Sequence, residues 1–133
     1  MTETEAQQFL ETNFAPWVLD LKPRVTAIGP EGASLTIPIG PHLLRTGGIL
    51  SGQAVTALAD TAMVLACGGH AGEMIPVGTV TLDTQFLRPA SGEALTARAE
   101  VTRAGRSMIF ARAELTEAPS GKTVALATAT FAR

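Results

Sequence analysis

The sequence predicts an α+β fold in which an antiparallel sheet of about five to six strands wraps around one long central helix. Residues 51–67 are the strongest helix candidate, because this run is apolar on nearly every side. Every later segment has the pattern of a strand, and turn signals recur at intervals of roughly 12–15 residues, which favours an antiparallel meander. Only the 51–67 helix is large and apolar enough to cover the buried face of such a sheet.

Residues 1–19 are expected to form an N-terminal helix followed by an apolar clasp. The helix should cover residues 3–14, where the apolar side chains lie toward one side. Thr2 or Thr4 is the expected cap. The clasp that follows contains Trp17.

A β-hairpin is expected next, with strands at residues 25–28 and 34–39 and a turn at Gly29-Pro-Glu-Gly32. Pro38 indicates that the second strand lies at a sheet edge or ends there. We expect the whole chain, residues 1–133, to form a single domain. The remaining expected elements are a loop at 42–50, a helix stop at Gly68-Gly69, and strands at 77–87, 94–102, 108–115 and 123–131.

Composition excludes several classes of protein. Apolar residues make up 46% of the 133 residues and charged residues only 17%, against about 25% charged in an average soluble domain. A net charge of −2 does not fit a nucleic-acid-binding surface, and a mean hydropathy of +0.25 does not fit disorder. A single cysteine excludes an internal disulfide framework. The apolar surplus predicts cover by a partner subunit or a ligand.

No membrane segment is expected. The longest apolar stretch, residues 54–67, has about fourteen residues, short of the roughly twenty that span a bilayer. The N-terminus is acidic and lacks the basic region of a signal peptide. We therefore expect a cytoplasmic protein.

One carboxylate, that of Asp60, does not fit the predicted apolar helix. Asp60 is too far from the helix start to act as a cap, and it forms a narrow polar stripe with Gln53 and Thr56. Burying an unpaired carboxylate costs several kcal/mol or forces it to protonate. Two interpretations are open. In the first, Asp60 is only structural, and its carboxylate is hydrogen-bonded to Thr56 or to neighbouring backbone, or faces solvent. In the second, Asp60 is a catalytic carboxylate that faces a substrate pocket.

The start of this helix has the features of an anion-binding site. Ser51 is the expected N-cap, and Gly52 leaves the backbone N–H groups of the first turn accessible. The helix dipole adds partial positive charge there, which suits an oxyanion that develops during a reaction. An ordinary helix cap is the alternative.

The other reactive side chains form no comparable pattern. His42 and His70, both expected in loops, are too far apart to form a metal pair or a triad. Cys67 is expected to be a small buried apolar residue, and no ligand spacing predicts a metal site. One polar strand face is expected, with Thr79, Thr81, Asp83 and Gln85.

Three segments follow the order and spacing of a known family. They read Gly47-Gly-Ile-Leu-Ser-Gly-Gln-Ala-Val-Thr-Ala-Leu-Ala-Asp-Thr-Ala-Met63, Phe86-Leu-Arg-Pro-Ala90 and Val101-Thr-Arg-Ala-Gly-Arg-Ser107. They resemble the hotdog-fold acyl-CoA thioesterases of the phenylacetate-degradation (PaaI-like) type. The resemblance covers roughly residues 20–133 and agrees with the predicted order of elements.

This resemblance implies roles for individual residues. Asp60 takes the place of the helix carboxylate that acts as general base or nucleophile. Gly52 matches the glycine whose N–H polarises the thioester carbonyl, and Thr79 best matches the Ser or Thr that orients the attacking water.

Three positions depart from the family pattern. Ser51 stands in place of the usual His and is expected among the catalytic residues, with Asp60, Gly52 and Thr79. Gln53 stands in place of a Gly, and Arg45 falls near a position that often holds Asn or Gln. Arginine suits the phosphates of coenzyme A because its guanidinium makes bidentate contacts. The residues expected to bind substrate are Gln53, Thr56, Arg45, Arg88, Arg103, Arg106 and Ser107.

The expected function is hydrolysis of an acyl-CoA thioester to a free acid and coenzyme A. No metal is expected, and coenzyme A enters only as part of the substrate. The resemblance implies a homo-oligomer, a dimer or a dimer of dimers, with shared active sites to which the neighbouring chain partly contributes Thr79 and the arginines that contact coenzyme A. No nucleic-acid or membrane partner is expected. One alternative is a non-catalytic acyl-CoA-binding module. The other is an enoyl-CoA hydratase, which would need a histidine near the helix start.

Overall fold

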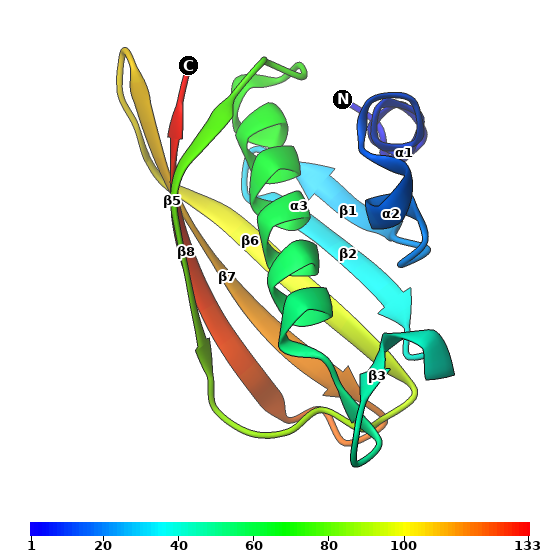
Figure 1. Cartoon of the computed structure of the whole chain (residues 1–133). Coiled ribbons are helices and arrows are strands. Elements are labelled where there is room, and N and C mark those ends of the chain that lie inside the picture. The colour runs from blue at the N-terminus through cyan, green and yellow to red at the C-terminus, as the bar shows by residue number, and fades with distance from the viewer.

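Six strands form one antiparallel sheet, and a long helix lies across one of its faces (Figure 1). The computed structural model describes residues 1–133. The strand order is β1-β2-β6-β7-β8-β5, and the expected α+β fold is confirmed. The elements are helix α3 (Gly52–Ala71) and strands β1 (Arg24–Gly29), β2 (Gly32–Pro38), β5 (Gly78–Phe86), β6 (Ala94–Ala104), β7 (Met108–Ala118) and β8 (Thr123–Ala132).

Helix α3 is longer than the sequence predicts. It continues through Gly68-Gly69 to Ala71 and ends at Gly72, whose φ of 84° is left-handed. The two glycines do not stop the helix, and Gly69 is needed for close packing: a Cβ on Gly69 would lie 2.5 Å from the carbonyl oxygen of Gly29 on β1. His70 therefore lies on the last turn of α3 and not in a loop. The 20-residue helix meets the length and hydropathy of a membrane span, but 67% of its most apolar window is buried inside this fold.

The expected four-strand meander holds for three strands. Strands β6, β7 and β8 are consecutive neighbours, whereas β5 pairs with β8 at the far side of the sheet. Strand β5 therefore has one free edge. Of the two alternatives expected for Pro38, the strand end is confirmed and the sheet edge is wrong. Strand β2 lies inside the sheet, between β1 and β6, and ends at this proline.

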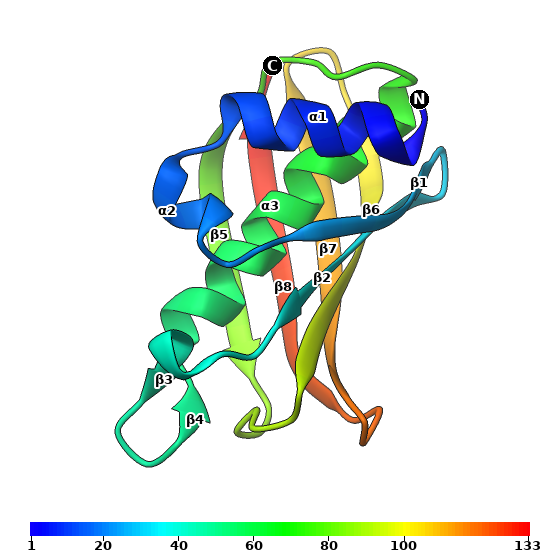
Figure 2. The ribbon, with the colours of Figure 1, turned by 90° about the vertical axis from the view of Figure 1, so that its right-hand side faces the viewer.

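The N-terminal segment packs beside α3 over β1 (Figure 2). Helix α1 (Glu3–Asn13) is capped by Thr2, which forms a capping box with Glu5. The Gln7 side chain accepts a hydrogen bond from the Val25 N–H at 2.8 Å and donates one to the Pro23 carbonyl at 3.0 Å. These bonds attach α1 to β1.

Four short elements lie in the two regions expected to lack regular structure. The clasp contains helix α2 (Pro16–Leu19). The segment 42–50, expected to be a loop, begins within a 3₁₀ turn, η1 (Pro41–Leu43), and contains a small hairpin of β3 (Leu44–Arg45) and β4 (Ile49–Leu50). This hairpin leads directly into α3.

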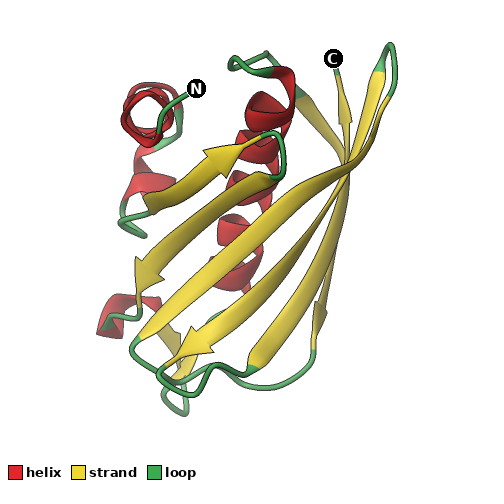
Figure 3. Cartoon of the chain, turned by 180° about the vertical axis from the view of Figure 1, so that it is seen from behind, coloured by secondary structure: helices red, strands yellow, loops and turns green.

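Small residues line the interface between sheet and helix. The sheet face that is buried under α3 is rich in alanine, which lets the helix lie close to the strands. No helix covers the opposite face of the sheet (Figure 3). The buried alanines of the sheet are Ala33, Ala97, Ala99, Ala111, Ala113, Ala125, Ala127 and Ala129.

Gly69→Ala tests the close approach of α3 to β1. Alanine normally stabilises a helix by about 1 kcal/mol relative to glycine. Here we expect a loss of about 1–3 kcal/mol in the free energy of unfolding, because the new methyl group would overlap the Gly29 carbonyl. Urea denaturation measures it. Gly78→Ala, whose methyl group would meet open space, is the matched control and should change stability by less than about 0.5 kcal/mol. A Gly69→Ala protein as stable as wild type would contradict this packing.

Candidate active site

Asp60 lies eight residues into α3, on the side of the helix that faces β5, and its side chain is partly buried. Burial raises the pKa of this carboxyl above its ordinary value, and a hydrogen bond from Thr79 opposes part of that rise. The Thr79 hydroxyl donates to Asp60 Oδ1 at 3.4 Å. No cation pairs with Asp60, since the ion pair of this chain joins Arg112 and Glu100.

The polar stripe on α3 divides between two partners on β5. Thr56 donates to the Thr84 hydroxyl at 3.3 Å and not to Asp60. The structural interpretation in which Thr56 holds the Asp60 carboxylate is therefore wrong. Asp60 keeps one oxygen free of any hydrogen bond within the chain.

An irregularity in β5 brings Thr79 to the helix. The pairing of β5 with β8 shifts register between Thr79 and Thr81, so that Thr79 points toward α3 together with Leu82 and Thr84. The expectation that Thr79 shares a strand face with Thr81, Asp83 and Gln85 assumes strict alternation and is wrong. The register shift has no signal in the local sequence.

A cavity of about 540 Å³ opens between α3 and β5 at Asp60. It is within the size range of small-molecule sites, roughly 300–1,000 Å³. Three of the predicted residues, Gly52, Gln53 and Thr56, line it together with Asp60. Four apolar side chains complete the lining, and sequence reasoning did not assign them to the site: Trp17, Ala57, Leu82 and Phe86.

The start of α3 lies at one end of this cavity. Ser51 Oγ accepts a hydrogen bond from the Ala54 N–H at 3.2 Å, which confirms Ser51 as the N-cap. The N–H groups of Gly52 and Gln53 have no acceptor within the chain. They can therefore donate to a bound oxygen atom.

A second cavity of about 410 Å³ meets the first one at Gly52 and Phe86. Arg45 and Arg88 line it, and no carboxylate does. The helix start thus lies between an apolar cavity with one carboxylate and a cavity with two guanidinium groups. This arrangement suits a ligand with an anionic end and an apolar end.

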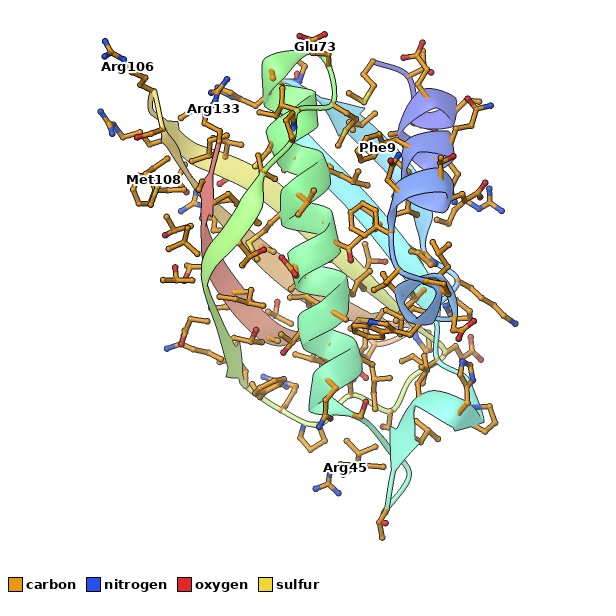
Figure 4. All side chains as sticks on the ribbon, turned by 45° about the horizontal axis from the view of Figure 1, so that its top comes forward. Phe9, Arg45, Glu73, Arg106, Met108 and Arg133 are labelled. Carbon is orange, nitrogen blue, oxygen red and sulfur yellow. The ribbon has the colours of Figure 1, made fainter.

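The structure does not bring all the predicted residues together. Gly52 and Asp60 are eight residues apart on one helix, which separates them by about 12 Å along its axis. Arg103 lies near the end of β6, and Arg106 and Ser107 lie in the turn between β6 and β7. Figure 4 places Arg106 and Arg45 at opposite ends of the molecule.

The remaining reactive side chains form no site. Cys67 is buried, and burial raises the pKa of its thiol to about 11, which makes it unreactive. His42 Nε2 lies 3.2 Å from the Asp20 carbonyl oxygen, on the surface. No three His, Cys, Asp or Glu side chains lie close enough together to hold a metal ion.

The family of this chain follows from its comparison with known proteins. The family model of the thioesterase superfamily matches residues 47–124, more than half of the chain and the part that contains α3 and β5. The chain therefore belongs to the thioesterase superfamily. The PaaI-like resemblance is confirmed as well, because PaaI itself is among the solved structures with this fold.

Two solved structures and one curated protein illustrate how similar this chain is to known proteins. A thioesterase family protein from Silicibacter pomeroyi is 27% identical with a TM-score of 0.82, covering 97% of this chain and 95% of that one. A mutant of the phenylacetic acid degradation protein PaaI from Thermus thermophilus is 27% identical with a TM-score of 0.79, covering 90% and 99%. A Thermoplasma acidophilum protein that is named as an esterase is 27% identical over 65% of this chain, and the match spans only 64% of that relative's length.

Ser51→Ala separates capping from chemistry at the helix start. The hydroxyl of Ser51 caps α3, so its removal should lower the free energy of unfolding by about 1 kcal/mol. The Gly52 N–H remains, and we expect turnover of any substrate to stay within about threefold of wild type, far from the 100-fold or larger loss expected of an oxyanion donor. Denaturation and steady-state kinetics on the same preparation measure both. A 100-fold loss of activity at unchanged stability would make Ser51 part of the chemistry.

Proposed function

We propose that this protein is an acyl-CoA thioesterase that uses Asp60 as its catalytic carboxylate. The observation that carries the proposal is the Asp60 side chain itself, unpaired with any cation and facing a largely apolar cavity. A partly desolvated carboxylate is a stronger base than one in water. Membership of the thioesterase superfamily supports hydrolysis as the reaction class.

In the proposed reaction a water oxygen adds to the thioester carbonyl carbon, and the Asp60 carboxylate accepts its proton. The negative charge that develops on the carbonyl oxygen is stabilised by the N–H groups at the start of α3. Collapse of this intermediate breaks the carbon–sulfur bond, and the thiolate of coenzyme A leaves and takes up a proton. In the alternative route for the same side chain, the Asp60 carboxylate attacks the carbonyl carbon and the thiolate of coenzyme A leaves. Water then hydrolyses the resulting anhydride to the free acid and the Asp60 carboxylate.

The two arginines at the second cavity support coenzyme A as the anionic part of the substrate. Arg45 and Arg88 both lie beside Gly52, where a thioester carbonyl would bind. Guanidinium groups bind phosphates in bidentate fashion. Arg103, Arg106 and Ser107 are too far away to join them within one chain, and in this proposal they serve only if a second copy brings them near.

The proposed active site is shared between two copies of the chain. Gly52 and Asp60 are about 12 Å apart on one helix, so they cannot both contact one carbonyl group. Strand β5 offers nine residues of free edge without lysine, arginine or proline, the residues that usually protect an edge. A two-fold axis that pairs β5 with its copy would reverse the direction of the second α3 and bring its Gly52 toward Asp60.

The exposed apolar residues also support β5 as the surface at which a second copy binds. Val80 and Phe86 on β5, and Leu87 just after it, are each more than half exposed in the single chain. At the opposite edge of the sheet, the Gln7 side chain already forms hydrogen bonds with the Val25 N–H of β1 and with the carbonyl oxygen of Pro23, just before β1. Edge pairing through β5 is therefore favoured over pairing through β1.

Asp60→Asn tests the catalytic carboxylate. The amide can still accept the hydrogen bond from Thr79 but cannot take a proton, so hydrolysis of acyl-CoA should fall at least 100-fold, an effect typical of losing a general base. A thiol-release assay over aromatic, short, medium and long acyl-CoAs measures it. Turnover by wild type should fall as the pH drops through the raised pKa of Asp60, because only the carboxylate is active.

The fold of this variant provides the control. Because the folded-state pKa of Asp60 is raised, ionisation of Asp60 removes stability as the pH rises through it, so Asp60→Asn should be at least as stable as wild type at pH 7. Near-normal turnover by a folded Asp60→Asn protein would exclude this mechanism. Binding of acyl-CoA without thiol release in wild type would favour a binding module.

Mixing two inactive variants tests the shared site. Gly52→Pro removes the N–H, while proline is favoured at the first helical position and the preceding Ser51 already has the extended backbone that proline requires. In a random mixture of Gly52→Pro and Asp60→Asn chains, half of the dimers contain one chain of each kind, and each of these dimers has one intact site out of two. The mixture should therefore regain about one quarter of wild-type activity. Sites built within one chain would regain none.

The matched control replaces the Gly52→Pro chain by an Asp60→Asn/Gly52→Pro double variant, which leaves no intact site in any dimer. Differently tagged chains and copurification show that mixed dimers form. Copurification without any recovery of activity would contradict the shared site and leave the role of Asp60 intact.

A further inference from the structure

The single tryptophan of the chain forms one wall of the cavity at Asp60. Trp17 lies on α2 and reaches the cavity from the N-terminal segment, before the residues that the family model matches. It is 60% exposed, the most exposed of the large apolar side chains. A bulky ring in this position leaves much apolar surface in water unless a ligand or a partner covers it.

The N-terminal segment is firmly attached, which fixes the position of this wall. Ala6 and Leu10 of α1 are fully buried, and the Gln7 side chain bonds to the backbone at Pro23 and Val25. The two residues after Trp17 pack against the hydrophobic core. The fold therefore holds Trp17 in place while its indole faces the cavity.

Strand β5 supplies the apolar wall of the same cavity through Phe86 and Leu82. The lining thus contains two aromatic rings, from α2 and from β5, that are distant in the sequence. Asp60 is the only charged residue of the lining. A second carboxylate inside this cavity would meet a like charge without any cation to compensate.

We propose that Trp17 is a specificity-determining residue that selects bulky, uncharged acyl groups by packing its indole against them. This inference rests on the proposed acyl-CoA thioesterase function. Short acyl groups reach the carbonyl-binding end of the cavity without contacting Trp17. Acyl groups that end in a carboxylate are disfavoured by Asp60.

Kinetics with four substrates test this role: benzoyl-CoA, hexanoyl-CoA, acetyl-CoA and succinyl-CoA. Trp17→Ala should lower kcat/KM about tenfold or more for the benzoyl and hexanoyl esters, and change it less than about twofold for the acetyl ester. Trp17→Phe should retain most of the activity on the bulky esters. Phe110→Ala, which removes an exposed ring on another strand, outside the cavity lining, is the matched control and should change none of the four.

Fluorescence gives a readout that does not depend on turnover. The chain has one tryptophan and no tyrosine, so its emission reports on Trp17 alone. The thioether S-hexyl-coenzyme A, which cannot be hydrolysed, should shift this emission to the blue in a saturable manner, while coenzyme A alone should not. Unchanged emission on binding of S-hexyl-coenzyme A would overturn the role of Trp17. An equal loss of kcat/KM for all four esters in Trp17→Ala would overturn it as well.

The two proposals fail in different ways. Absence of hydrolysis with every ester, together with a saturable emission shift, would overturn the thioesterase function and support the acyl-contacting position of Trp17. Hydrolysis that depends on Asp60 but is indifferent to Trp17 would support the function and overturn this inference.

Discussion

The off-centre packing of α3 on the sheet determines where a ligand can bind. The helix packs mainly against β2, β6 and β7 and barely contacts β5. Alanines on the inner sheet face let it lie close to the central strands, and Gly69 lets its last turn meet β1. The side chains that β5 turns toward the helix are consequently left without a tightly packed partner. The space between α3 and β5 is the cavity at Asp60.

The same packing sets the electrostatics of Asp60. On the side of α3 that faces the central strands, a carboxylate would be fully buried among alanines, and no cation is available there to compensate. On the side that faces β5 it is only partly desolvated, which raises its pKa without removing it from water altogether. Thr79 is the one side chain that bonds to it, and this bond depends on the register shift in β5. Basicity and access therefore both arise from the position of α3 on the sheet.

The sequence predicts those features that depend on local chemistry. The Ser51 cap, a threonine cap at the start of α1, and the placement of Asp60 on an apolar helix all follow from residue types at fixed spacing. Features that depend on distant segments could not be predicted. Gly68-Gly69 has the composition of a helix stop, and only the nearness of Gly29 shows that Gly69 serves packing. The position of β5 beside β8 and the placement of Trp17 and Asp60 at one cavity also depend on contacts between distant segments.

The geometry of one helix also connects the proposed chemistry to assembly. An oxyanion donor and a carboxylate that act on the same carbonyl group must lie within a few ångströms of it. Eight residues of α-helix place Gly52 and Asp60 much farther apart, and no bending of a helix packed along its length closes that gap. The helix would therefore be a poor scaffold for this reaction in a single chain. It becomes a suitable one when a second α3 runs in the opposite direction, and the free edge of β5 is where such a copy can attach.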